Sequence, residues 1–300
     1  MTHESFLSRA LPQAVQVVAQ IHHSHGTKAM VALTRLTSAF PHWPDSVWEA
    51  ALTRARWFDE PRTSAVAIAP KIAMTEHRAR ILVSRSVVPA AYTAVREWAR
   101  LAGTEAVIRH YLEEASSDPG SLGHRLSVLL GFLEAWPLYR GGPYELLFFD
   151  RLTEFLLAGR FAASFVSTER ARCSVDEAVR GAVRRPGFFG HHLICLAWIC
   201  RNRAFLSEPQ LGSALTWVVK ASATVYADEE DNVIIEVDDG LAPSREALEG
   251  SLRDLLTLGV PNIHLLTLAD AIATLWPRGD ELVQKHLLAL ASQFTQKDAA

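Results

Sequence analysis

Apolar residues recur every three to four positions along most of the chain, a spacing that places them on one side of an α-helix. In the segment 5–25, Leu7, Leu11, Val18 and Ile21 form one such stripe. The same spacing predicts further helices at about 27–40, 46–59, 89–102, 104–116, 121–136, 143–158, 188–205, 209–226, 244–258, 262–276 and 279–295. The pattern therefore predicts an all-α fold, an irregular bundle of about 12 helices.

Two short sequences have the form of a capping box, in which a serine hydroxyl and a glutamate three residues later each accept a backbone N–H at a helix start. Ser46 with Glu49 is one, and Ser174 with Glu177 is the other. Both predict the first turn of a helix.

The segment 228–240 departs from the helical pattern. It holds seven acidic residues around the β-branched Val233, Ile234 and Ile235, which favours a loop with a short strand or hairpin arm. The acids lack the alternating spacing of a calcium-binding loop. We therefore expect a short, acidic, β-like excursion on the surface and not an ion site.

With 300 residues, 49% of them apolar, the chain can bury a large core. We expect a single helical domain over 1–300; a division into two lobes would fall near 160–186. The net charge of −3 provides no basic surface for nucleic acid.

The three cysteines form no Cys-x-x-Cys pair and, lying within apolar stretches, favour reduced, buried thiols in a cytoplasmic protein. The first residues lack the basic start and apolar run of a signal peptide, and no uncharged apolar stretch reaches the length of a membrane span. The sequence thus predicts neither secretion nor contact with a membrane.

The chain has twelve histidines, several of them on apolar helical faces. His22 and His25 continue the apolar stripe of the first helix and are three residues apart, so both rings can face inward as metal ligands. The alternative is a histidine-rich helix end before Gly26, whose side chains satisfy the last carbonyl groups.

His124, His192 and His264 each lie near the start of an apolar helical segment. His192 is preferred to its neighbour His191 because it shares a helical face with apolar residues at 189, 196 and 199. Each can be either a core histidine bonded to a carbonyl or a ligand in one site between helices. Imidazole ligands favour iron, zinc, copper or nickel, and a redox function would favour iron.

Lys220 is the only charged residue within the apolar segment 215–226. Its side chain either reaches solvent or is buried, uncharged and available for catalysis. Lys28, one turn after His25, is the competing candidate.

Four segments together resemble the questin oxidase-like family of helical, iron-dependent oxygenases that act on anthraquinones and related polyketides: 21–36, 122–124, 190–193 and 262–271. The resemblance implies iron bound by His25, His124, His192 and His264 with a carboxylated lysine, and O2 used to insert oxygen into a quinone-like ring or to open it. In the family the lysine follows the last histidine by three residues, where this chain has Thr267. Either Lys220 or Lys28 replaces it, or the site lacks the carboxylated lysine and with it the usual iron chemistry of the family.

The leading hypothesis is therefore a metal-dependent oxygenase of secondary metabolism, with iron as cofactor and a small, planar, apolar aromatic substrate together with O2 as partners. One alternative is a helical enzyme with zinc or with no metal, such as a cyclase or hydrolase. The other is a helical-repeat-like scaffold that binds a protein on a concave face, which predicts that the histidines lie scattered through the fold.

Overall fold

The computed structural model describes residues 25–56, 73–159, 161, 173–238, 240–259 and 262–296. Regular structure within these residues is helical, in α-helices and short 3₁₀ turns without a strand, so the all-α prediction is confirmed. The helices are α2 (His25–Ala39), α3 (Asp45–Arg56), α4 (Glu76–Ser84), α5 (Ala90–Ala102), α6 (Thr104–Ser117), α7 (His124–Tyr139), α8 (Glu145–Ala158), α9 (Val175–Arg184), α10 (His191–Arg201), α11 (Glu208–Ala223), α12 (Arg245–Thr257), α13 (Ile263–Leu275) and α14 (Glu281–Gln296). The helix expected over 5–25 lies outside the described residues except for its last position.

One of the two predicted capping boxes is present. Ser174 Oγ accepts the N–H of Glu177 at 3.1 Å, and the Glu177 carboxylate accepts the N–H of Ser174 at 2.7 Å, so α9 begins where its capping box predicts. Ser46, in contrast, lies inside the first turn of α3, which begins at Asp45. Since the N–H of Val47 donates to the Pro44 carbonyl at 3.0 Å, the helix begins two residues earlier than a capping box at Ser46 predicts, and this prediction is wrong.

The acidic segment leaves the helical body as predicted, but its described residues contain no strand. Glu229–Asp231 form a 3₁₀ turn, and extended chain follows. Ile235 is buried, and its N–H donates to the Arg184 carbonyl at 2.9 Å. One hydrogen bond and one buried side chain attach the segment to α9, which is too little pairing for a strand.

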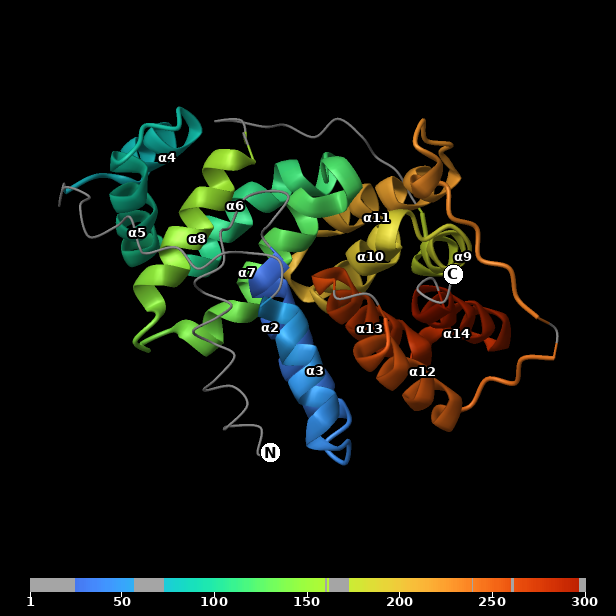
Figure 1. Cartoon of the computed structure of the whole chain (residues 1–300). Helices are drawn as coiled ribbons and strands as arrows, with labels where there is room; N and C mark the ends of the chain where they lie inside the picture. Colours follow the sequence, from blue (N-terminus) through green and yellow to red (C-terminus); the bar gives the residue numbers. More distant parts are fainter. Residues whose placement is uncertain are drawn as a thin grey trace.

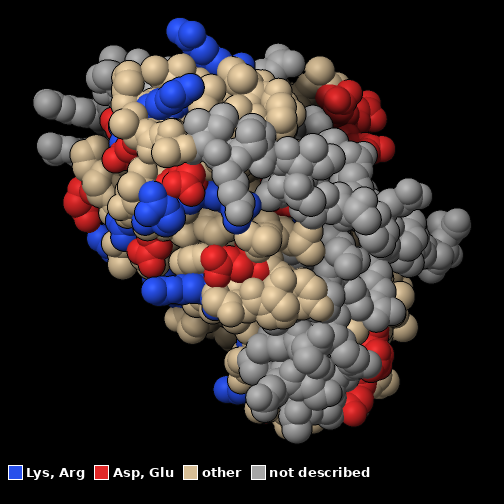
Figure 2. Space-filling view, turned by 90° about the vertical axis from the view of Figure 1, so that its left-hand side faces the viewer, with Lys and Arg blue, Asp and Glu red and all other residues tan. Residues whose placement is uncertain are grey.

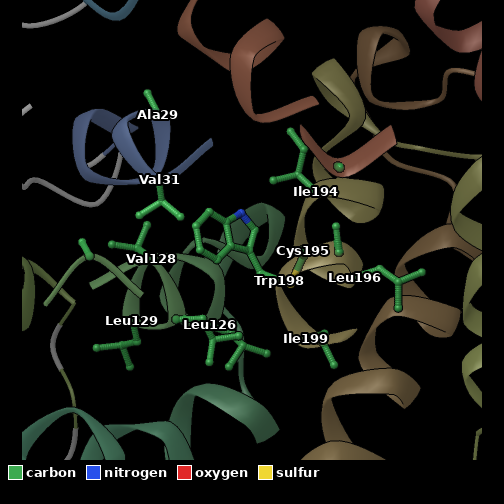
Figure 3. Packing of buried hydrophobic residues seen from close by; sticks show 14 of the residues in the cluster. Ala29, Val31, Leu126, Val128, Leu129, Ile194, Cys195, Leu196, Trp198 and Ile199 are labelled. Atoms are coloured by element: carbon green, nitrogen blue, oxygen red, sulfur yellow. The ribbon is translucent and has the colours of Figure 1, made fainter. Parts of the chain in front are cut away.

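Four helices, α2, α7, α10 and α13, form a closed ring in the middle of the molecule, each packed against the next. Helices α4, α5 and α8 lie on one side of this ring, and α9, α12 and α14 lie on the other (Figure 1). Trp198 of α10 fills the space inside the ring, facing Val31 of α2 and Val128 of α7 (Figure 3).

Buried apolar side chains from α2 to α14 form one connected core. The possible division into two lobes near 160–186 stays a prediction, since most of 160–172 lies outside the described residues.

Basic and acidic side chains are interspersed over the face shown in Figure 2, as far as its residues are described. This mixture agrees with the small net charge of −3. In the described part of the chain, no helix has both the length and the apolar content to cross a bilayer.

An ionic network around the buried pair of Arg201 and Asp270 joins the same four helices. Arg201 of α10 contacts Asp270 of α13 and donates to Glu134 of α7 at 3.1 Å, and Arg35 of α2 donates to Asp270 at 3.2 Å. Burial alone would lower the pKa of Arg201, but Asp270 and Glu134 raise it above its ordinary value. The guanidinium of Arg201 also lies 4.0 Å from the centre of the Trp198 ring. The network therefore ties all four helices together through charge.

We expect Asp270→Asn to lower the free energy of unfolding by about 2 to 3 kcal/mol, because Arg201 keeps its buried charge and loses one of its carboxylates. Urea denaturation measures this change. Arg100→Ala, which breaks an exposed pair with Glu97, is the control and should cost about 0.5 kcal/mol or less. Equal effects of the two substitutions would show that the network does not hold the ring together.

Candidate metal centre

Four buried histidines meet inside the ring, one from each helix, and we call His25, His124, His191 and His264 the histidine cluster. The ring centroid of His25 lies 4.3 Å from that of His264 and 5.1 Å from that of His124. His191 completes the circle, 4.8 Å from His124 and 4.7 Å from His264. The order of the imidazoles follows the order of the helices around the ring.

Three of these imidazoles are close enough to share one metal ion. His25, His124 and His264 each offer a ligand nitrogen within 4.8 Å of the other two, and no second group of this kind is found among the described residues. Imidazole nitrogens bind zinc at about 2.0–2.1 Å, which places two ligands of one ion about 3–4 Å apart. Small side-chain rotations would therefore suffice for coordination, and His191 lies beside the three as a fourth candidate.

The same local sequence, Pro-Gly-x-x-Gly-His, places two of the four histidines. It occurs at 119–124 and again at 186–191. In each copy the second glycine donates to the carbonyl of the first, and the residue after the histidine donates to the proline carbonyl at 2.9 Å. Both copies therefore form the same turn and leave the histidine as the first residue of a helix, α7 or α10.

Each turn ends in two residues with left-handed backbone, and the second of them is glycine. The φ angles are 54° and 76° at Leu122 and Gly123, and 46° and 78° at Phe189 and Gly190. A Cβ atom at Gly190 would lie 2.6 Å from Leu268 of α13. Glycine is therefore required at this position for two reasons: the left-handed backbone angle and the close approach of α13.

His264 is positioned by Asn262, the N-cap of α13. Asn262 Oδ1 accepts the backbone N–H of His264 at 2.9 Å and lies 2.7 Å from its ring Nδ1, so Nδ1 carries the proton. His191 is arranged in the same way, since its Nδ1 donates to the Phe188 carbonyl. In both residues Nε2 is then the nitrogen with the lone pair, the tautomer that metal-binding histidines adopt.

The cluster contains buried nitrogens whose hydrogen-bonding capacity is unused. Both ring nitrogens of His25, which is 1% exposed, and Nε2 of His191 have no hydrogen-bond partner. Leaving one buried polar group unsatisfied costs about 1–3 kcal/mol. A bound metal ion would satisfy these nitrogens, so the residues present fit such a group.

Burial and mutual proximity keep the imidazoles of His25, His191 and His264 uncharged. Burial, followed by the neighbouring His264, lowers the pKa of His25 and of His191 well below the usual range. Burial, then Lys28 and His124, lowers the pKa of His264 to about 3. Neutral imidazole is the form that binds metal.

Lys28 lies beside the cluster, buried between α2 and α7. Its Nζ donates to Ser127 Oγ at 3.2 Å. Burial lowers the pKa of Lys28 to about 8, with Cys195 opposing this shift and Arg201 adding to it. Gly131 leaves room for the lysine side chain, because a Cβ atom there would lie 2.8 Å from Lys28 Cγ.

The structure brings together His25, His124 and His264 from the candidates named by sequence analysis. His25 begins the described part of α2 and is followed by helix, so it does not mark a helix end before Gly26. His22 lies outside the described residues.

His192, the ligand predicted from the sequence, is not in the group of imidazoles that could share one ion, and both of its ring nitrogens lie near other groups. Nδ1 lies 3.0 Å from the Arg185 carbonyl, and Nε2 lies 3.4 Å from the Tyr226 hydroxyl. The helical-face argument for His192 assumed one helix from 188 onward, whereas the left-handed turn ends at Gly190 and α10 begins at His191. The repeated Pro-Gly-x-x-Gly-His sequence is the signal that identifies His191.

Lys220, the catalytic residue predicted from the sequence, is not among the residues that the structure brings together at the histidine cluster. It lies exposed in the last turn of α11, which agrees with the alternative that its side chain reaches solvent. Lys28 is the lysine that the fold places beside the histidines.

Comparison with known protein families, with curated proteins and with solved structures finds no match for this chain. The resemblance to the questin oxidase-like family stays a prediction.

We expect His191→Ala to weaken binding of Co²⁺ at least about tenfold, because it removes one imidazole of the cluster. His192→Ala is the matched control; it lies next along the chain, and Co²⁺ affinity should stay unchanged. Isothermal titration of the two variants, with circular dichroism to verify folding, gives the comparison. Weaker binding in the His192 variant alone would show that His192, and not His191, is the ligand.

Proposed function

We propose that this protein is a metal-dependent oxygenase, in which iron held by His25, His124 and His264, with His191 as a further ligand, acts with O2 on a planar aromatic substrate. The observation that carries the proposal is the set of three buried imidazoles whose ligand nitrogens lie within 4.8 Å of one another. Buried histidines that served packing alone would be expected to bond to nearby carbonyls, and His25 does not.

The choice of iron rests on the ligand type and on the family resemblance. Imidazole ligands suit iron, zinc, copper and nickel, and the resemblance to iron-dependent oxygenases selects iron among them. When bound at a site with an open position, iron supplies the means to use O2 in oxygen insertion or ring cleavage. Zinc remains the alternative, since three histidines and one open position also form a catalytic zinc site.

The chain itself orients the ligands and keeps water away. The Phe188 carbonyl and the Asn262 side chain hold the rings of His191 and His264 through Nδ1, so that the lone pair of each ring lies on Nε2. All four histidines of the cluster are buried. These residues thus keep a set of neutral nitrogens in fixed positions before any metal arrives, which lowers the cost of binding.

Two phenylalanines of the left-handed turn support an aromatic substrate. The ring of Phe188 is nearly parallel to that of His191, at 6.0 Å and 10°, and Phe189 is nearly parallel to His264, at 5.5 Å and 21°. Both phenylalanines are only partly buried. Their flat, apolar rings lie between the cluster and the surface. A planar aromatic ring packs well against such side chains.

The scaffold hypothesis is less well supported. It predicts histidines scattered through the fold, whereas four of them meet at one point, each on a different helix. A surface for protein binding would not require this convergence.

Elemental analysis of the purified protein tests the proposal. We expect stoichiometric iron, and O2 consumption with a panel of hydroxylated anthraquinones that stops when a chelator removes the metal. His25→Ala should lose the metal and the O2 consumption, while His77→Ala, at an exposed position on α4, should keep both.

Stoichiometric zinc without O2 consumption would contradict the oxygenase and favour the zinc enzyme. Protein without metal, and without affinity for added Fe²⁺ or Co²⁺, would contradict the metal centre altogether.

A further inference from the structure

A pocket of about 280 Å³ lies between α5, α6, α7 and α8, and no histidine of the cluster lines it. Pockets for drug-sized ligands have volumes of about 300–1,000 Å³. A pocket just below this range fits a smaller molecule, and its lining residues define the chemistry of that molecule.

Part of the pocket wall is apolar. Trp136 of α7 and Phe149 of α8 lie with their ring centroids 5.4 Å apart, and Leu146 of α8 also lines the pocket. Trp136 is only partly buried and Leu146 is 49% exposed, so a bound apolar group would remove this surface from water. The ligand is therefore expected to carry an apolar body.

Two arginines of α5 also line the pocket, four residues apart and thus on one helical face. Arg100 Nε donates to the Glu97 carboxylate at 3.0 Å, so the charge of Arg100 is paired. Arg96 is half-buried and, among the residues that the structure describes, makes no hydrogen bond or ion pair. Its guanidinium is therefore a cation of the pocket without a counter-ion.

Thr104, the first residue of α6, adds a buried hydroxyl to the pocket. The residue is 5% exposed, and its hydroxyl has no hydrogen bond within the described part of the chain. Its N-cap, Gly103, has no side chain that could cap the first N–H groups of α6. An unsatisfied buried hydroxyl is costly, and a ligand oxygen would remove that cost.

The two glutamates of the pocket already have partners. Glu97 pairs with Arg100, and Glu145 accepts the backbone N–H of Gly141 and lies in the first turn of α8, where the helix dipole favours a negative charge. Neither of them neutralises Arg96. Their charges oppose a ligand with two negative charges, such as a phosphate, more strongly than a ligand with one.

We propose that this pocket binds a small monocarboxylate with an apolar body. The carboxylate would accept hydrogen bonds from Arg96 and Thr104, and the apolar body would pack against Trp136 and Leu146. A planar guanidinium matches a carboxylate with two parallel hydrogen bonds, and an aromatic body packs well against an indole ring. The pocket contains no residue of the histidine cluster, so its ligand does not depend on a bound metal.

The probe is 4-fluorophenylacetate, whose ¹⁹F NMR signal broadens on binding even when affinity is low. We expect the wild-type protein to bind it, and Arg96→Met to bind it at least about tenfold more weakly, because the charge that pairs with the carboxylate is lost. Arg78→Met removes an exposed arginine of α4 that does not line the pocket, so this matched control should bind as wild type. Circular dichroism verifies that both variants fold.

Thr104→Val tests the hydroxyl, since valine keeps the shape of the side chain and removes its polar atom. Binding of 4-fluorophenylacetate should weaken about threefold or more, because one hydrogen bond to a charged group is lost. Unchanged affinity in this variant would show that the carboxylate does not lie beside Thr104.

A comparison of ligands needs no variant and covers the case in which Arg96→Met does not fold. The uncharged 4-fluorophenylacetamide has nearly the same shape and should bind the wild-type protein at least about tenfold more weakly than the acetate. The inference is overturned by equal affinity for the acetate and the amide, by absence of acetate binding, or by equal affinity of the Arg96 and Arg78 variants. Tighter binding of 4-fluorophenyl phosphate would also overturn it, because the pocket would then favour a dianion.

Discussion

The packing of α2, α7, α10 and α13 into a closed ring is the constraint on which the rest of this structure depends. Two polar layers lie within the ring, the histidine cluster near the described helix starts and the ionic network further along the same helices. Because both layers receive one residue from each helix, the four helices run in the same sense. A rotation or shift of any one helix would disturb both layers, so the geometry of the histidine cluster and the stability of the ring are coupled.

The two layers differ in how their polar groups are satisfied. In the ionic network, Arg201 meets carboxylates from two helices, and burial strengthens these contacts. In the cluster, like groups face like groups: the imidazoles depress one another's pKa, and His25 finds no hydrogen-bond partner. A protein interior rarely keeps such an arrangement unless a ligand completes it. This contrast is the physical reason for assigning binding to one layer and stability to the other.

Helical periodicity was sufficient to predict the fold class and most helices, because their apolar faces are long and buried. It missed α4, a short helix in which only Ala79 and Val83 are buried, so the sequence carries almost no apolar stripe there. For the candidate site, the position of His124 and His264 at the start of apolar helices was informative, because these helix starts converge inside the ring.

The positions of His191 and Lys28 beside the cluster depend on features that helical periodicity does not contain. The choice of His191 over His192 depends on the left-handed backbone at Phe189 and Gly190, which sets the first residue of α10. The choice of Lys28 over Lys220 depends on Gly131, a residue of another helix that leaves space for the lysine side chain. An isolated charge in an apolar segment was therefore a poor indicator of burial.

The central claim is that separate helices bring their imidazoles to one ion. X-ray absorption spectroscopy of the metal-loaded protein tests this claim most directly. The account predicts a first shell that contains at least three imidazole nitrogens at about 2.0–2.1 Å, with the outer-ring scattering typical of histidine. A first shell of sulfur ligands, or of oxygen ligands without imidazole, would contradict it.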